Sequence, residues 1–318
     1  MKGPNSKEYV LIVFTGGTIS VAPSHSNSGP ALGARELLGP LRSEDIPVKA
    51  VDLYRVMSES LTWDHVSKLV EFLKDAMQQP QVRGVVVSHG TDTMEEVSYF
   101  VDLVGPWPKP IVFTGAMRHS ELIAADGPAN LSDAIQTAYD SESANRGVLV
   151  VMNQEIHTAR YVIKEHSTNL ATFVSPGAGP LGSVLEGRVR YYWNTLPQEK
   201  FYTVPSGLNW PKVEIIRIGL ASSALLIRAC LEAKVDGIVI EGVGAGHVPD
   251  YLLPDIYKLV KANIQVWVVP RTHRGHPLYA TYPTPGSEIS LQAMGVKMEE
   301  GPGYKARLRM MLEISGNS

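Results

Sequence analysis

Short runs of apolar, mostly β-branched residues alternate along this chain with longer stretches in which apolar residues recur every three or four positions. The first pattern is typical of buried strands and the second of amphipathic helices. In the stretch 62–77, for example, Val66, Leu69 and Leu73 share one helical face behind Thr62, which suits the N-cap. The first half of the chain is predicted to hold strands at 9–14, 48–54, 84–88, 110–114 and 148–152, and helices at 62–77, 95–104 and 131–142. Strands that alternate with helices form βαβ units, so we expect an α/β fold with a mostly parallel sheet.

The alternation stops between Arg188 and Pro211, where Tyr, Trp, Pro and Gly residues crowd together. We interpret 188–211 as a linker between an N-terminal α/β domain at 1–187 and a smaller C-terminal α/β domain at 212–318. The smaller domain is predicted to hold strands at 213–218, 237–241 and 265–269 and helices at 221–233 and 252–262.

Composition narrows the class of protein. The 29 Lys and Arg residues against 32 Asp and Glu give a net charge of −3, which excludes the basic footprint of a nucleic-acid-binding protein. The single cysteine, Cys230, cannot form an intrachain disulfide, and its surroundings indicate the buried face of a helix. The apolar run near the N-terminus is shorter than that of a signal peptide, and no stretch approaches a membrane span. We therefore expect a cytoplasmic protein with no membrane partner.

Three of the predicted strands lead into turns rich in hydroxyl groups and glycine. The first leads into Thr15-Gly16-Gly17-Thr18, the third into the segment 88–93 and the fourth into the segment 114–118. Ligands of open α/β sheets bind beyond the carboxyl ends of the strands, so these turns are the candidate site. Two of the turns have plainer interpretations: the first can be a simple tight turn and not a phosphate cradle, and Thr91 and Asp92 can cap the following helix.

Two such turns at one edge of a sheet can place a threonine hydroxyl against a polar substrate. Threonine is a poor nucleophile without a base, and a lysine with a lowered pKa can act as one. Lys164 is the candidate, although an ordinary solvated lysine fits its position as well.

Other kinds of catalytic site find no support. The chain has no GxSxG or HExxH motif, and one cysteine excludes zinc-finger spacing. His273 and His276 lie in a loop bracketed by prolines, with no acidic third ligand nearby in sequence. We expect no metal at this loop.

The motifs VFTGGTIS at 13–20 and VVVSHGTDTMEEVSYF at 85–100 resemble those of the bacterial-type L-asparaginases, a family that includes glutaminase-asparaginases. Further similar segments are FTGAMR at 113–118, ADGPANL at 125–131, ANRGVLVVMN at 144–153, STNLATFVS at 167–175, GPLG at 179–182 and, more loosely, DGIVIEGVGAGHVP at 236–249.

The resemblance implies a hydrolase that converts L-asparagine to aspartate and ammonia without a cofactor. It implies Thr18 as the acyl-accepting nucleophile, and Thr91, Asp92 and Lys164 as a second cluster that assists proton transfer. It also implies substrate contacts from Ser58, Glu59, Gly90 and the main chain of Ala116. Two alternatives stay open: a preference for glutamine or another amide, and a catalytically weak protein that binds amino acids.

The family is usually assembled as a homotetramer of tight dimers in which a neighbouring subunit completes each site. Glu288 is our candidate for the glutamate that the neighbour contributes, and His247 occupies a position where relatives often have Asn or Ser. The family's tyrosine on the loop after TGGT is missing, since residues 21–32 contain none. His25 in that loop is one candidate for the base that would replace it.

Overall fold

The computed structural model describes residues 8–17, 46–195, 200–204 and 210–316. The chain divides into two compact units, Met1–Phe201 and Tyr202–Ser318. Both units are layered α/β structures, which confirms the fold class predicted from the sequence pattern.

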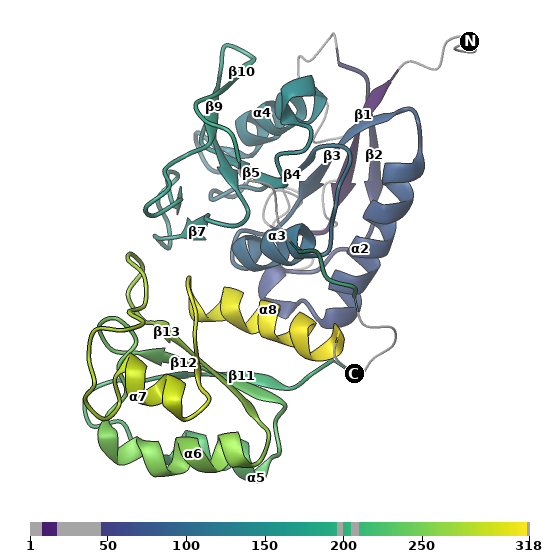
Figure 1. Ribbon diagram of the computed structural model, residues 1–318. Helices are drawn as coiled ribbons and strands as arrows, with labels where there is room; N and C mark the ends of the chain where they lie inside the picture. Colours follow the sequence, from purple (N-terminus) through teal and green to yellow (C-terminus); the bar gives the residue numbers. More distant parts are fainter. Residues whose placement is uncertain (1–7, 18–45, 196–199, 205–209, 317–318) are drawn as a thin grey trace. The chain divides into compact units, whose positions relative to one another are not determined.

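The larger unit is built on an eight-stranded sheet with the order β10-β9-β6-β5-β4-β3-β1-β2 (Figure 1). Its five parallel strands are β1 (Tyr9–Phe14), β2 (Val48–Asp52), β3 (Val82–Ser88), β4 (Ile111–Thr114) and β5 (Val148–Met152). These match the five predicted strands to within two residues at each end. The apolar runs of β1, β3, β4 and β5 reflect burial on both faces, as is usual for parallel strands, whereas β2 at the edge of the sheet is partly exposed.

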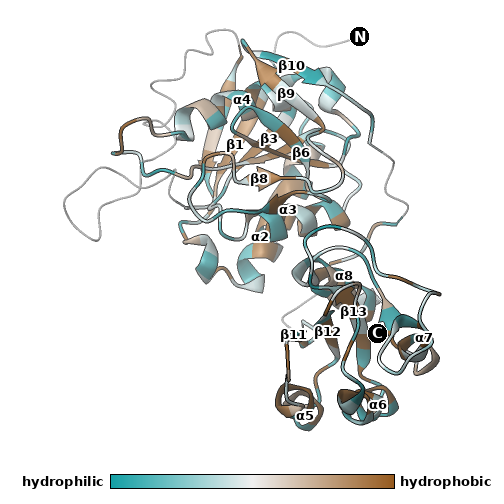
Figure 2. Cartoon of the chain, turned by 90° about the vertical axis from the view of Figure 1, so that its left-hand side faces the viewer, coloured by the Kyte–Doolittle hydropathy of each residue, from teal (hydrophilic) through white to brown (hydrophobic). Residues whose placement is uncertain are grey.

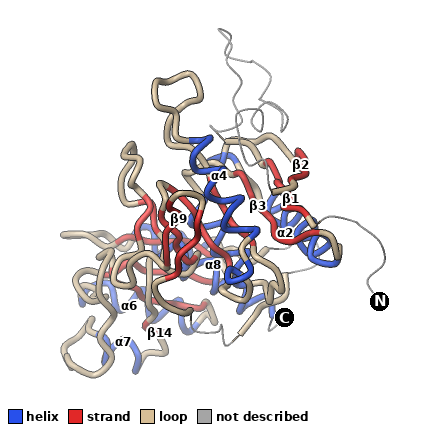
Figure 3. The backbone as a smooth tube through the Cα atoms, turned by 90° about the horizontal axis from the view of Figure 1, so that it is seen from above, coloured by secondary structure: helices blue, strands red, loops and turns tan. Residues whose placement is uncertain are grey.

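Three helices cover the two faces of this sheet. They are α2 (Trp63–Gln78), which follows the predicted cap Thr62, α3 (Met94–Leu103) and α4 (Gly127–Tyr139). Figure 1 shows α4 on one side of the strands and α2 and α3 on the other, and Figure 3 shows α2 beside β1, β2 and β3. Alternate strand residues such as Val10 and Ile12 pack against Leu131 and Ile135 of α4. The brown central strands of Figure 2 are this apolar core.

The sheet extends beyond the parallel strands through a part that we did not predict. Strands β6 (Glu155–Thr158), β9 (Gly182–Leu185) and β10 (Arg188–Tyr191) pair antiparallel at one edge. A separate two-stranded ribbon joins β7 (Ile163–Lys164) to β8 (Phe173–Val174). Strand β10 thus occupies the first residues of the stretch 188–211, where we expected a linker.

The smaller unit has four parallel strands in the order β11-β12-β13-β14. Their bounds are β11 (Val213–Arg217), β12 (Gly237–Gly242), β13 (Gln265–Pro270) and β14 (Lys297–Met298), and the helices are α5 (Leu225–Glu232), α6 (Leu253–Lys261), α7 (Glu288–Ala293) and α8 (Gly303–Gly316). Helices α5 and α6 pack on one face of the strands, and α8 contacts β11, β12 and β13. Cys230 lies on the buried face of α5, as predicted.

Two helices begin four residues away from their predicted starts, and the other three predicted helices begin within one residue. Helix α4 starts one turn early, at Gly127, with Pro128 in its first turn, where proline needs no backbone N–H partner. Helix α5 starts four residues late, because Ala221 has a φ of 53° that a right-handed helix does not allow. Among the described residues, no helix is both long and apolar enough to cross a bilayer.

Candidate functional site

The three hydroxyl-rich turns meet at the carboxyl ends of β1, β3 and β4, as the parallel order predicts. The backbone N–H and the hydroxyl of Thr15 both donate to the carbonyl oxygen of Ser88, at 3.1 and 2.9 Å. The backbone N–H of His89 donates to the carbonyl oxygen of Thr114 at 2.8 Å. These bonds continue the sheet ladder past the strands and fix the turns against one another.

Close backbone contact makes glycine necessary at the centre of this arrangement. A Cβ atom on Gly17 would lie 2.5 Å from the Cα of Gly90, and one on Gly90 would lie 2.6 Å from Oγ of Ser58. Gly17 also has a φ of 82°, which side chains disfavour. The glycines of both motifs therefore let the first and third turns touch.

A small cavity of about 140 Å³ opens between the turns. It is lined by Gly17, Met57, Ser58, Gly90, Thr91, Asp92, Ala116, Met117, Lys164 and Ser167. The structure thus brings together six of the residues named from the sequence: Ser58, Gly90, Thr91, Asp92, Ala116 and Lys164. Thr18 directly follows Gly17 but lies outside the described residues, as do the loop 21–32 and His25.

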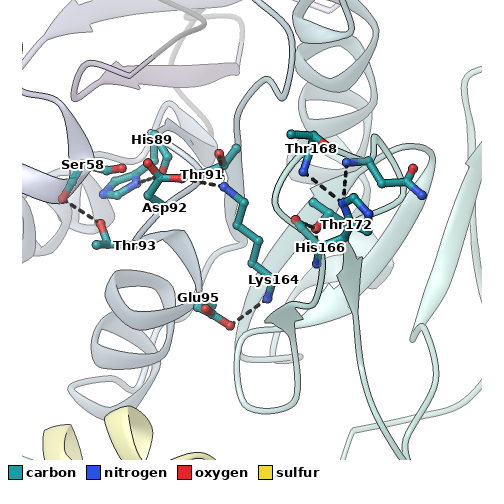
Figure 4. A network of polar contacts seen from close by, with 12 residues as sticks. Ser58, His89, Thr91, Asp92, Thr93, Glu95, Lys164, His166, Thr168 and Thr172 are labelled. Atoms are coloured by element: carbon teal, nitrogen blue, oxygen red, sulfur yellow. Dashed lines mark hydrogen bonds and ion pairs between the residues drawn. The ribbon is translucent and has the colours of Figure 1, made fainter. Parts of the chain in front are cut away.

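Lys164 is the centre of the charged network in this cavity (Figure 4). Its Nζ lies 2.6 Å from Oδ1 of Asp92 and donates to Oγ1 of Thr91 at 3.0 Å. Only 12% of the lysine side chain is exposed, so the interpretation as a solvated lysine is wrong. The plain capping role of Thr91 and Asp92 is also wrong, because α3 begins at Met94 with Thr93 at the N-cap.

Hydrogen bonds to the main chain fix both Lys164 and the loop that follows it. Its backbone N–H donates to Oε2 of Glu95 at 2.8 Å, which ties it to the first turn of α3 (Figure 4). Beyond it, the Thr172 hydroxyl accepts a bond from the backbone N–H of His166 at 2.8 Å and donates to the His166 carbonyl oxygen. These bonds close the loop that carries Ser167 to the cavity.

His89 is a buried neutral histidine directly before Gly90. Its Nδ1 lies 2.7 Å from the carbonyl oxygen of Gly90, which only accepts, so Nδ1 carries the proton. Burial lowers the pKa of His89 to about 4. The ring is therefore uncharged at neutral pH, and it orients the Gly90 carbonyl without adding charge to the site.

Ser58 and Glu59 lie in a short 3₁₀ helix, Ser58–Ser60, on the other side of the cavity. Ser58 is buried against Gly90, and its carbonyl oxygen accepts the Thr93 hydroxyl at 3.0 Å. Glu59 is exposed and does not line the cavity.

Asp126 and Asn130 of the α4 start support the turn that carries Ala116. The carboxylate of Asp126 accepts the backbone N–H groups of Met117 and Arg118, each at 2.9 Å. The amide of Asn130 donates to the carbonyl oxygen of Gly115 and to Asp126, both at 3.0 Å. Through these hydrogen bonds the ADGPANL motif clamps the 115–118 turn.

Glu288 has a different environment from that expected of a substrate-binding group. It belongs to the smaller unit and is fully buried, with Oε1 accepting the backbone N–H groups of Thr281 and Tyr282 at 2.7 and 2.6 Å. Nε2 of His247 lies 3.4 Å from its Oε2. The pKa of Glu288 lies below its usual value because these donors outweigh its burial. Its Oε1 thus stabilises the 281–288 turn, and the contribution of Glu288 to a neighbouring subunit's site stays a prediction.

In the described part of the chain, no three His, Cys, Asp or Glu side chains gather as metal ligands. In the loop that contains His273 and His276, Nδ1 of His276 lies 3.3 Å from Oε1 of Glu300.

Sequence reasoning did not identify Glu95, Asp126, Asn130 or Ser167 as parts of the site. All four lie within the segments that carried the family resemblance, so the signal was present in the motifs but had no assigned role. Their functions depend on backbone contacts between segments, which no local pattern encodes.

Comparison with known proteins agrees with this architecture. Residues 9–197 match the family described as asparaginase, N-terminal, and residues 212–317 match the glutaminase/asparaginase C-terminal domain. An L-asparaginase of Bacillus licheniformis is 32% identical over 313 residues, covering 96% of this chain and 95% of the relative. L-asparaginase 2 of Escherichia coli is 38% identical over 253 residues, covering 75% of this chain and 71% of the relative.

A solved structure, described as a probable cytoplasmic L-asparaginase from Campylobacter jejuni, superposes with a TM-score of 0.87 at 30% identity, covering 97% of this chain and 95% of the other. The motifs, the fold and both domain matches agree, and the chain belongs to the asparaginase family of amidohydrolases.

Proposed function

We propose that this protein is an L-asparaginase that hydrolyses the side-chain amide of L-asparagine through an acyl-enzyme on Thr18. The observation that carries the proposal is the Asp92–Lys164–Thr91 network on the wall of a small polar cavity that begins at Gly17. An amide nitrogen can leave as ammonia only if it gains a proton, and a hydroxyl attacks only if it loses one. The network provides groups that hold and move protons beside the expected nucleophile.

In the proposed reaction the Thr18 hydroxyl oxygen attacks the amide carbonyl carbon and ammonia leaves. Water then attacks the resulting ester and releases aspartate. The ammonium of Lys164, 3.0 Å from Oγ1 of Thr91, stabilises negative charge on that hydroxyl as its proton moves. The Asp92 side chain lines the cavity and is 60% exposed, so its carboxylate is suited to pair with the substrate ammonium.

The cavity supports a small polar amino acid as the substrate. Five of the lining residues, Ser58, Thr91, Asp92, Lys164 and Ser167, bear a hydroxyl or a charge. The glutaminase-asparaginase of Acinetobacter glutaminasificans, 34% identical over 268 residues, makes glutamine the second amide to test. We further propose a homo-oligomer, most simply a dimer of dimers, and a cytoplasmic location like that named for the Campylobacter jejuni relative.

The decisive experiment measures ammonia release from asparagine, glutamine and D-asparagine by the wild type and by Thr18→Ala. We expect asparagine to give the highest kcat/KM, and Thr18→Ala to lose about a thousandfold or more in kcat because a covalent step is removed. Aspartate binding by calorimetry should persist in Thr18→Ala. A variant that keeps more than about a tenth of the turnover would contradict the assignment of Thr18.

A further inference from the structure

A second, larger cavity lies in the larger unit, at the end of the parallel strands opposite to the candidate catalytic site. Its volume is about 390 Å³, within the range of small-molecule sites. Its lining residues lie at and beyond the end of α3, before β5, at and beyond the end of β6, and after β10. Because β3, β4 and β5 are parallel, the start of β5 and the carboxyl ends of β3 and β4 lie at opposite ends of the strands. This cavity is therefore separate from the candidate catalytic site, and no residue lines both.

One polar group in this cavity is buried without a partner. The side chain of Thr158 is 7% exposed, and its Oγ1 has no hydrogen-bond partner among the described residues. A buried hydroxyl with no partner costs stability, and at the wall of a cavity a bound water or ligand can supply the missing hydrogen bond. Asp102, also 7% exposed, differs because Oδ1 accepts the backbone N–H of Val148 at 2.8 Å.

Aromatic rings form much of the remaining wall. The indole N–H groups of Trp107 and Trp193 donate to the carbonyl oxygens of Val101 and Pro180, at 2.7 and 3.0 Å. Their donors are thus used within the protein, and the rings offer the cavity apolar surface. Tyr161 and Phe201 also line it and remain 41% and 38% exposed. A wall of this kind favours a flat ring as the ligand.

Two arginines add positive charge to the cavity. The guanidinium of Arg146 is fixed over the Tyr191 ring, 3.9 Å from its centroid, and donates to the Trp193 carbonyl oxygen at 3.2 Å. The Arg160 guanidinium lies 5.6 Å from the centroid of Tyr161. Against the single carboxylate of Asp102, the two guanidinium groups give the cavity lining a net positive charge, which favours an anion.

We propose that this cavity is a binding site for a small planar aromatic carboxylate. The ring packs among Trp107, Trp193 and Tyr161, the carboxylate pairs with Arg160, and the Thr158 hydroxyl gains its missing hydrogen bond from the ligand. The site is independent of the amidohydrolase activity proposed above.

The test titrates indole-3-acetate into the full-length protein and follows binding by calorimetry and tryptophan fluorescence. We expect saturable binding that is about tenfold tighter than that of indole, which has the ring but no charge, and than that of acetate. Thr158→Val and Arg160→Gln should each weaken binding about fivefold or more. Arg188→Gln removes an exposed arginine outside the cavity and should leave the affinity unchanged.

Thermal melting separates loss of binding from loss of the fold. Because the Thr158 hydroxyl is unpaired in the free protein, Thr158→Val should keep or raise the melting temperature. A lower melting temperature in Thr158→Val would show that the hydroxyl has a structural partner and would overturn the proposal. So would the absence of saturable binding up to about 10 mM, or equal affinities in the wild type, Thr158→Val and Arg160→Gln.

Discussion

At the scale of single residues, the contact between Lys164 and Thr91 decides how the candidate site works. Groups that share one proton-transfer path lose their effect together, so their mutations are not additive. We expect Lys164→Met and Thr91→Val each to lower kcat by about a hundredfold or more, and the double variant to be little worse than either. Steady-state ammonia release from the four proteins of this double-mutant cycle measures the coupling.

A matched control for this cycle pairs Lys164→Met with Thr137→Val. Thr137 is buried in α4, where its hydroxyl donates to the Asp133 carbonyl oxygen and has no contact with the Lys164 network. That pair should be additive. If the losses from Lys164→Met and Thr91→Val simply multiplied, the two side chains would act independently.

His89 makes the stability of the larger unit depend on pH. Its pKa is about 4 in the folded protein against an ordinary value of 6.5, so between these values the unfolded chain binds a proton that the folded chain does not. The contribution is complete above pH 6.5 and is lost as the pH falls toward 4, and it amounts to ~3 kcal/mol at most. Urea unfolding between about pH 7.5 and about pH 4.5 should show this loss.

His89→Asn is the comparison for that experiment, because an amide can still donate to the Gly90 carbonyl oxygen but does not titrate in this range. Its unfolding free energy should change less with pH than that of the wild type. Equal slopes in the two proteins would mean that His89 is not the source of the pH dependence.

The sequence pattern alone could not predict the environment of Lys164. A lysine in a short strand carries no local signal that separates a solvated side chain from a catalytic one. Its position followed only from the family motifs, and its contacts with Asp92 and Glu95 depend on pairs some 70 residues apart.

At the scale of elements, the start of α4 serves the site through the 115–118 turn. Removing the Asp126 carboxylate leaves the backbone N–H groups of Met117 and Arg118 without their acceptor. We expect Asp126→Ala to raise KM for asparagine about tenfold, with a smaller effect on kcat, because the turn would present Ala116 less precisely. Asp126→Asn keeps one acceptor oxygen and should recover part of the loss. A KM unchanged in Asp126→Ala would show that the clamp has no role in binding.

The elements that the pattern predicted share one property, and those that it missed share another. Strands β1, β3, β4 and β5 are almost entirely apolar and buried, so the pattern predicts them nearly residue for residue, and the partly exposed β2 was predicted two residues too long. The strands β6, β9 and β10 are four residues long and include polar positions, which cannot be told from loops without their partners. Helix α8 lacks a clear apolar stripe although Leu308, Met311 and Leu312 are buried, so its pattern does not stand out.

At the scale of the whole molecule, the proposed assembly is the main prediction. The exposed large side chains of the smaller unit include Leu220, Leu225, Leu226 and Tyr251, and Leu220 and Tyr251 line the same hollow. Apolar surface of this kind marks protein interfaces. Light scattering should therefore give a particle of about four times 34.7 kDa.

Substituting this surface tests the link between assembly and activity. Leu220→Glu combined with Leu225→Glu should shift the particle toward smaller species and lower ammonia release in parallel, if neighbours complete each site. Lys261→Glu changes the charge of the same unit at an exposed helical position and should do neither. An active monomer at assay concentration would contradict the prediction.

The single cysteine gives this protein a natural reporter of its own local opening. Cys230 lies on the inner face of α5, and burial raises the pKa of its thiol. Alkylating reagents attack the thiolate, so the rate of modification follows the fraction of time that α5 is detached from its sheet. Because the chain has no second thiol, that rate measures local unfolding of the smaller unit alone. The measurement does not require the larger unit to unfold.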